Sequence, residues 1–234
     1  GGAFVSVGAL RDLVVGGSLL VGGGKAWLGP RRHVVWGMSK DLGMSGLRFG
    51  TLWSQNPALL AAMGSAAVFS SVPGPVQAMA TSLLSDKPFI DAYLLENSRR
   101  LASSCALLMA RLDALQLGNY ARPTAGLFLW ADLRPLLPLV QARLPAQAGA
   151  AAGASGAGGS AEKAGRASGW AAEAALYELL QAKCRLVLTP GASQHCAEPG
   201  HFRFCYAFVP PRDLEAALDK FAAFVGELRN LGNC

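Results

Sequence analysis

A short run around Lys40 carries three side chains with distinct chemistry. Lys40 supplies an amine, the preceding Ser39 supplies a hydroxyl, and Arg48 supplies a guanidinium eight residues further along. A lysine amine that has lost its proton condenses with an aldehyde to form a Schiff base, and a planar guanidinium binds phosphate through two hydrogen bonds. Gly43 and Gly46 let the backbone approach a ligand closely, because no Cβ stands in the way. The run therefore suits an aldehyde cofactor that carries a phosphate.

The segment before this run is expected to be a β-strand. Residues 32–36 are rich in β-branched and aromatic side chains, which places Lys40 where a strand ends in a loop. Open α/β sheets bind ligands at such strand ends. A Ser–Lys pair alone is common, however, and a solvated surface lysine is the ordinary explanation for it.

A second group of residues lies near the end of the chain, where a turn-rich loop leads into an expected strand over 202–209. Phe202, Phe204, Tyr206 and Phe208 alternate, so we predict that they share one face and that Arg203 points the other way. Burying a guanidinium costs free energy unless it meets an anion, so we expect a carboxylate partner for Arg203. That partner is either a bound ligand or an Asp or Glu of the same chain.

The run from 38 to 50 resembles the lysine segment of the class I/II aminotransferase family, which are fold-type I pyridoxal 5'-phosphate enzymes. The resemblance implies that Lys40 is the catalytic residue, which holds the cofactor and transfers protons. It implies that Ser39 and Arg48 bind the cofactor phosphate. It also implies that Arg203 binds the α-carboxylate of an amino-acid substrate.

The second group narrows the resemblance to one branch of the family. The pattern Pro-Gly-x-Ser-x-His-Cys-x-Glu-Pro-Gly-x-Phe-Arg over 190–203 is most similar to the branch that contains 1-aminocyclopropane-1-carboxylate synthase. Two positions depart from it: Gly37 stands where the family usually has a phosphate-binding serine, and His201 stands where the branch usually has tryptophan. We therefore predict that Gly37→Ser tightens cofactor binding in a chain long enough to bind it.

The similarity appears at six places in the same order, which indicates the family rather than the substrate. The six places are 4–7, 38–50, 83–89, 93–101, 125–134 and 190–203. The resemblance implies an α/β fold: residues 1–105 would be the remainder of a large parallel or mixed-sheet domain with a long connecting helix, and 106–234 a small α+β domain. The family's other cofactor contacts precede the lysine by more than the 39 residues present here. We therefore expect a C-terminal part of such an enzyme that is inactive alone.

Hydrophobic periodicity predicts the remaining elements. Helices are expected over 56–69, 75–84, from 85–88 to about 118, 169–183 and from 213 onward, and further strands over 48–54, 125–131 and 185–188. The Ala/Gly/Ser-rich stretch 141–169 is predicted to be a disordered insertion, and 16–29 a loop insertion.

Composition limits the other classes of function. The chain has 234 residues, is 52% hydrophobic and 15% charged, and carries a net charge of +6. The basic residues are scattered, so we expect no nucleic-acid partner, and no apolar run is long enough to span a membrane. Five cysteines without a Cys-x-x-Cys pair favour a reducing compartment, the cytoplasm, with a plastid left open. His195, Cys196 and His201 match no common zinc spacing, so no metal is expected.

Three hypotheses about the function remain open at this point. The resemblance implies an enzyme that acts on an amino acid, as a homodimer, by transamination or by ring closure on S-adenosylmethionine. A non-catalytic remnant or dimerisation module of the same fold is the first alternative. An unrelated phosphate-binding α/β domain is the second, and it would need further phosphate donors that the sequence does not offer.

Overall fold

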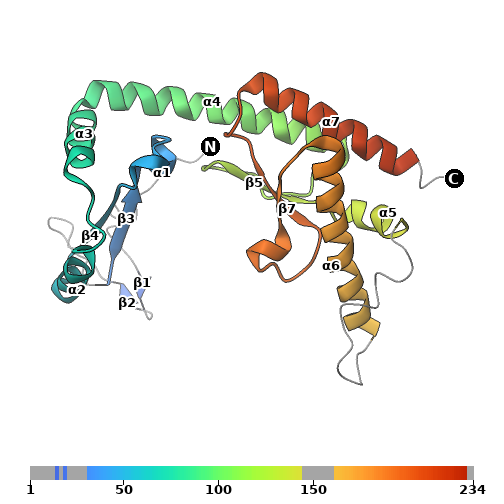
Figure 1. The fold of residues 1–234 in the computed structure, drawn as a ribbon, viewed down its shortest axis with the longest axis horizontal. Coiled ribbons are helices and arrows are strands. Elements are labelled where there is room, and N and C mark those ends of the chain that lie inside the picture. Colours follow the sequence, from blue (N-terminus) through green and yellow to red (C-terminus); the bar gives the residue numbers. More distant parts are fainter. Residues whose placement is uncertain (1–13, 16–17, 20–30, 144–160, 231–234) are drawn as a thin grey trace. The chain divides into compact units, whose positions relative to one another are not determined.

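A computed structural model describes residues 14–15, 18–19, 31–143 and 161–230 (Figure 1). The chain divides into two compact units, Gly1–Glu96 and Asn97–Cys234. The division falls within the long helix α4, Lys87–Ala114. The expected domain boundary at 105/106 stays a prediction.

The first unit is built on a β-hairpin. Strands β3 (His33–Gly37) and β4 (Gly50–Ser54) pair antiparallel, with Gly37 opposite Gly50. A second antiparallel pair joins β1 (Val14–Val15) to β2 (Ser18–Leu19), and β2 falls within the stretch 16–29 expected to be a loop insertion, most of which lies outside the described residues. All strand pairs described in this unit are antiparallel, so the parallel strands that we expected are not among them.

Two short helices that were not predicted lie within the hairpin connection, and the predicted helices follow the hairpin in the expected order. They are α1 (Met38–Asp41) and the 3-10 turn η2 (Ser45–Leu47) within the hairpin connection, then α2 (Pro57–Ala67), α3 (Gly74–Ser85) and the start of α4. The Asn56 side chain caps α2 by accepting a hydrogen bond from the Leu59 N–H at 3.1 Å. Asp86 likewise accepts from the Phe89 N–H, and Pro88 sits in the first turn of α4, which confirms the expected start of that helix.

The first unit has a small core. Its buried cluster consists of Met38, Leu42 and Ala80, with partly buried side chains such as Trp36 and Phe49 packed against it. Trp36 and Phe49 meet edge to face, with ring centroids 6.5 Å apart. Helix α2 contributes no buried residue. The hairpin connection is therefore anchored mainly through Met38 and its neighbours.

The second unit contains an antiparallel sheet of order β5-β7-β6. Its strands are β5 (Phe128–Asp132), β6 (Thr189–Pro190) and β7 (His201–Cys205). Its helices are η3 (Arg134–Leu136), α5 (Leu137–Gln141), α6 (Ala161–Leu179), the π-helical turn η4 (Leu180–Cys184), η5 (Gly191–Gln194) and α7 (Pro211–Asn230). Helices α5 and α6 lie side by side (Figure 1).

The core of this unit forms between the sheet and α7. Leu129, Ala131, Phe202 and Phe204 are buried on one sheet face. The predicted stripe on α7 is confirmed, since all five of its residues are buried: Leu214, Leu218, Phe221, Val225 and Leu228. Phe204 meets Phe221 edge to face at 5.8 Å, so α7 packs on this sheet as expected.

Three sequence-based expectations were wrong. Residues 185–188 form no strand: Arg185 adopts a left-handed backbone that ends η4, and the strand comes later as β6. Strand β7 stops at Cys205, where the chain bends before α7, so Phe208 is 88% exposed instead of sharing the buried face. Residues 161–169, expected to be disordered, belong to α6, while 144–160 lie outside the described residues.

Within the described residues, no helix is both long enough and apolar enough to cross a membrane.

Candidate functional site

Lys40 follows the end of strand β3 at Gly37, as predicted, but it lies in the short helix α1 and not in a loop. Asp41, its neighbour, accepts a hydrogen bond from the Trp36 indole at 2.6 Å and so ties the helix to the strand. The Lys40 side chain is exposed in this unit, and Ser39 is half-buried. The described residues of the first unit therefore leave the Lys40 side chain open to solvent.

Arg48 closes the same hairpin connection. Its backbone is left-handed, with φ at 52°, and its Nη1 donates to the Ser45 carbonyl oxygen at 3.0 Å. The side chain is exposed, which leaves its remaining N–H groups accessible. Lys40 and Arg48 thus lie on one connection, 38–49, whose ends are joined by the Met38 N–H bonded to the Phe49 carbonyl at 3.2 Å.

Gly37 occupies a tight place at the end of β3. Its backbone is extended, with φ at −155°, so other residues can adopt it. A Cβ added here would lie 3.2 Å from the Phe49 carbonyl oxygen. A serine at this position therefore requires the hairpin to shift by a few tenths of an ångström.

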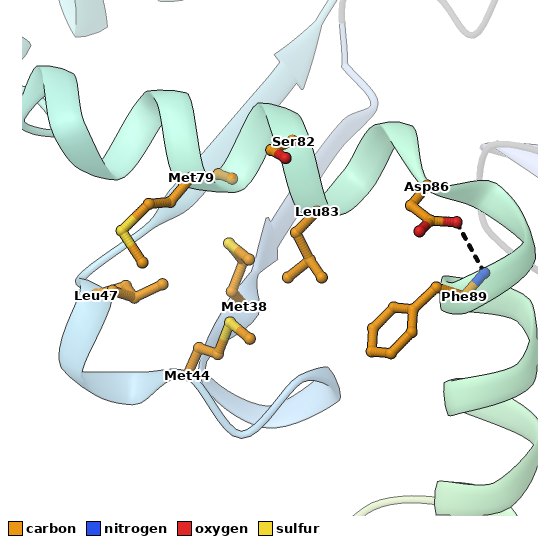
Figure 2. A pocket seen from close by; sticks show the side chains of 9 residues that line it. Met38, Met44, Leu47, Met79, Ser82, Leu83, Asp86 and Phe89 are labelled. Carbon is orange, nitrogen blue, oxygen red and sulfur yellow. Dashed lines mark hydrogen bonds between the residues drawn. The ribbon is translucent and has the colours of Figure 1, made fainter.

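An open cavity of about 500 Å³ lies in the first unit (Figure 2). Its lining is mostly apolar and includes Met38, Met44 and Met79, while Asp86, its one charged lining residue, uses its carboxylate to cap α4. Neither Lys40 nor Arg48 lines it. A phosphate group would find no cation in this cavity, so we do not assign it to a phosphate-bearing cofactor.

Arg203 lies in β7 with its side chain on the face opposite Phe202 and Phe204, as predicted. Its guanidinium stacks on the Phe128 ring, with Cζ 4.4 Å from the ring centroid. Nη1 donates to the Gln194 side-chain oxygen at 3.3 Å and Nη2 to the Thr189 hydroxyl at 3.2 Å. Its Nε is buried and has no hydrogen-bond partner.

The partners of Arg203 are neutral. Across the described parts of the chain, no Asp or Glu forms an ion pair with it, so the intramolecular salt bridge that we kept as an alternative is not seen. A guanidinium without a counter-ion, with one N–H unsatisfied, is suited to binding an anionic group.

The loop that leads to Arg203 is held from two sides. Glu173 on α6 is only 1% exposed, and its carboxylate accepts the backbone N–H groups of Ala192 at 2.9 Å and Gly200 at 2.5 Å. Arg134 donates from Nη1 to Glu198 at 2.9 Å. These contacts fix both ends of the loop 191–200.

Asp132 in turn holds Arg134. Its carboxylate accepts two hydrogen bonds from the Arg134 side chain and one from Asn119 at 2.7 Å. Burial alone would raise the pKa of Asp132, but the hydrogen bonds from Arg134 and Asn119 outweigh it, and the pKa lies below its usual 3.8.

Sequence reasoning missed Glu173, Arg134 and Phe128 as supports of Arg203. The alternation in β5 would have placed Phe128 and Trp130 on the face of the sheet away from the core. No sequence signal pointed to Glu173, because its partners are distant backbone groups. Among the described residues, no three His, Cys, Asp or Glu side chains are grouped so that they could hold a metal ion.

The family model for aminotransferase class I and II matches residues 12–221. The chain belongs to this family. Among curated proteins it is 32% identical over 201 residues to a 1-aminocyclopropane-1-carboxylate synthase from Malus domestica, covering 86% of this chain and 36% of that protein. It is 34% identical over 202 residues to 1-aminocyclopropane-1-carboxylate synthase 4 from Oryza sativa subsp. japonica, with 86% and 36% covered. The chain thus spans about a third of the length of these relatives.

Solved structures show the same fold at lower identity. The aromatic aminotransferase from Pyrococcus horikoshii superposes with a TM-score of 0.62 at 18% identity, over 84% of this chain and 43% of that one. The pyridoxal-phosphate-bound C–S lyase from Staphylococcus hominis superposes with a TM-score of 0.61 at 16% identity, over 90% and 46%. The family member described here therefore has a mixed α/β fold that corresponds to less than half of an aminotransferase chain.

Proposed function

We propose that this chain carries the cofactor lysine and the substrate-binding arginine of a pyridoxal 5'-phosphate enzyme that acts on an amino acid. The observation that carries the proposal is that the Arg203 guanidinium meets only neutral groups among the described residues, namely the Gln194 and Thr189 side chains and the Phe128 ring. An α-carboxylate supplies two oxygens and a negative charge, which such a fork binds in a bidentate manner. Family membership gives the chemical context.

The residues of the 38–49 connection fit the cofactor by their chemistry. Lys40 offers an exposed amine for the aldehyde, and Arg48 offers exposed guanidinium N–H groups for the phosphate. Ser39 adds a hydroxyl donor to the phosphate. Gly37 supplies no hydroxyl, so this part of the phosphate site is weaker than in relatives with serine there.

When bound, pyridoxal 5'-phosphate supplies an aldehyde for amines and a ring that takes up electrons from the substrate Cα. Lys40 Nζ first anchors the cofactor and, once released, accepts the Cα proton. Arg203 orients the substrate by its carboxylate, which fixes the direction of the Cα–H bond. Arg134 and Glu173 act only by positioning the loop next to Arg203.

Two reactions are compatible with these residues. In a transaminase, Lys40 would give back the proton that it had accepted from the substrate Cα. In a 1-aminocyclopropane-1-carboxylate synthase, the name carried by the relatives, S-adenosylmethionine loses its sulfonium group as a ring closes. Assays for both products with a longer chain distinguish them. We expect such an enzyme to act as a homodimer in the cytoplasm, and the 234-residue chain alone to be inactive.

A second candidate is a non-catalytic remnant or dimerisation module of the same fold. It is favoured by one observation, namely that neither Lys40 nor Arg48 lines the cavity of the first unit. It predicts that the cofactor labels Lys40 no faster than any other exposed lysine.

Borohydride reduction in the presence of pyridoxal 5'-phosphate tests the proposal. We expect mass spectrometry to find the label on Lys40 in preference to Lys87, an exposed lysine paired with Asp91. Arg48→Leu should lower labelling of Lys40 and leave Lys87 unchanged. Equal labelling of both lysines in the unsubstituted chain would overturn the enzymatic proposal.

Arg203→Leu separates substrate binding from stability. We expect labelling of Lys40 to persist, while protection by an added amino acid is lost. If Arg203 has only a structural role, the variant instead unfolds at lower urea concentration and protection by the amino acid is unchanged.

A further inference from the structure

We propose that Cys196 is a nucleophilic thiol, activated by His201, that reacts with hydroperoxides. The Cys196 Sγ lies 3.8 Å from the His201 Nδ1, within hydrogen-bonding distance for sulfur. Cys196 is half-buried, so part of the residue is open to solvent. A partly exposed thiol beside an imidazole is the environment in which cysteines become reactive.

The fold holds both members of the pair in place. His201 belongs to β7, and its ring stacks on Trp130 of β5, with centroids 5.9 Å apart and an angle of 4° between the rings. The Cys196 backbone N–H donates to the Gly191 carbonyl at 3.0 Å. The contact between the two side chains therefore joins a fixed loop to a strand, across the bend at Pro199 and Gly200.

Several ionisable side chains lie near Cys196 and His201 in the sequence or the fold, and most of them form hydrogen bonds with other groups. Asp132 is the register partner of His201 on β5, but its carboxylate is held by Arg134 and Asn119. Glu173 on α6 binds backbone N–H groups, and Glu198 in the loop binds Arg134. His195 and Arg203, the other titratable neighbours in sequence, lie on the same loop and strand. For Cys196, the structure gives His201 as the side chain placed to take its proton.

The reaction balances with a hydroperoxide as the oxidant. The His201 Nδ1 takes the thiol proton, and the sulfur attacks the nearer peroxide oxygen, so an S–O bond forms as the O–O bond breaks. The departing oxygen receives the proton from His201 and leaves as water when the oxidant is hydrogen peroxide. Sulfur is oxidised to a sulfenic acid, and the peroxide is reduced.

The other described cysteines provide internal controls. Cys105 and Cys184 are buried, and burial raises the pKa of both thiols, which disfavours reaction. Cys205 is exposed, and no imidazole hydrogen bond to it is seen in the described residues. Accessibility alone therefore predicts that Cys205 reacts faster than Cys196, whereas activation by His201 predicts the reverse.

Treatment with hydrogen peroxide, followed by trapping of the sulfenic acid with dimedone, tests which of Cys196 and Cys205 reacts faster. Trypsin cuts after Arg185, Arg203 and Arg212, so Cys196 and Cys205 fall in separate peptides. In the 234-residue chain we expect Cys196 to be labelled about tenfold faster than Cys205. In concentrated urea the two rates should become equal. Labelling of Cys205 at an equal or higher rate in the native chain would refute the proposal without any variant.

Two substitutions test the role of the imidazole. His201→Phe keeps an aromatic ring to stack on Trp130, and His201→Gln keeps a polar side chain. In both, we expect Cys196 to be labelled more slowly than Cys205, with the Cys205 rate unchanged as a sign that the sheet is intact. Unchanged labelling of Cys196 in either variant, with the Cys205 rate also unchanged, would show that His201 does not activate it.

Discussion

The Arg134 guanidinium binds the buried Asp132 carboxylate through two hydrogen bonds, Nε to Oδ1 at 2.9 Å and Nη2 to Oδ2 at 2.6 Å. The carboxylate is 6% exposed by residue, whereas the arginine side chain is 46% exposed. The pair links the end of β5 to the loop that precedes Arg203, because Arg134 also binds Glu198.

Asp132→Asn should destabilise the chain by about 2 kcal/mol, because a charged acceptor of Arg134 is lost in a buried position. Urea unfolding at about pH 7 measures this cost. Glu227→Gln is the matched control: its ion pair with Lys183 is exposed at 3.4 Å, so its loss should cost about 0.5 kcal/mol or less.

The contact between Asp132 and Arg134 also predicts that the free energy of unfolding depends on pH in the acid range. The folded-state pKa of Asp132 is lower than its usual 3.8, so its contribution is complete above that value and is lost as the pH falls through the folded-state pKa. The stability difference between the unsubstituted chain and Asp132→Asn should therefore shrink as the pH falls below 3.8. A difference that stays the same until the chain unfolds in acid would contradict the assignment.

Gly200→Ala should be strongly destabilising. The backbone has φ at +97°, and a new Cβ would lie 2.6 Å from Cγ and 3.1 Å from Cα of Arg134. Gly126→Ala separates the two causes, because Gly126 has φ at +87° with no atom within 4 Å of the added Cβ. We expect about 1 kcal/mol at Gly126 from backbone strain, and at least about 2 kcal/mol more at Gly200 from the clash. Equal losses in urea unfolding would show that the loop does not pack on Arg134.

Local sequence patterns were sufficient to predict several helices and the direction of one side chain. The stripe on α7 follows from helical periodicity, the start of α4 follows from Asp86 and Pro88, and the direction of Arg203 follows from strand alternation. Each depends on residues within a few positions of one another. The two strands that flank Lys40 were predicted for the same reason, but their antiparallel pairing was not.

Contacts between distant segments could not be predicted. Glu173 binds backbone groups 19 and 27 residues away, and Arg134 binds Glu198 across 64 residues. The short β7 is another case, since its end at Cys205 depends on where α7 begins to pack. These features depend on tertiary packing, which overrides the local preference of Phe208 for a strand.

Gly37→Ser should strengthen phosphate binding at a small cost in stability. The new hydroxyl adds a donor, but the Cβ lies 3.2 Å from the Phe49 carbonyl, so the hairpin must adjust at a cost of about 1 kcal/mol. Gly46→Ser is the control, because no atom lies within 4 Å of its added Cβ. Titration with pyridoxal 5'-phosphate of a chain extended to the relatives' length should give tighter binding only for Gly37→Ser. No gain over Gly46→Ser would count against Gly37 as a phosphate position.

Tyr206 should set an alkaline limit on stability. Burial, followed by the nearby Cys105 thiol, raises the pKa of Tyr206 to about 12 from 10.0, and its hydroxyl donates to the Gly126 carbonyl at 2.8 Å. The unfolded chain ionises first, so this contribution is complete below 10.0 and is lost as the pH rises toward 12. Burial and the hydrogen bond to Asp113 also raise the pKa of Tyr120, so ultraviolet titration of tyrosinate should show more than one late-ionising tyrosine, and the one near pH 12 should disappear in Tyr206→Phe. The stability difference between the unsubstituted chain and Tyr206→Phe should be constant up to a pH of about 10 and should fall above it. A difference that does not change above that pH would mean that the Tyr206 hydroxyl is solvated.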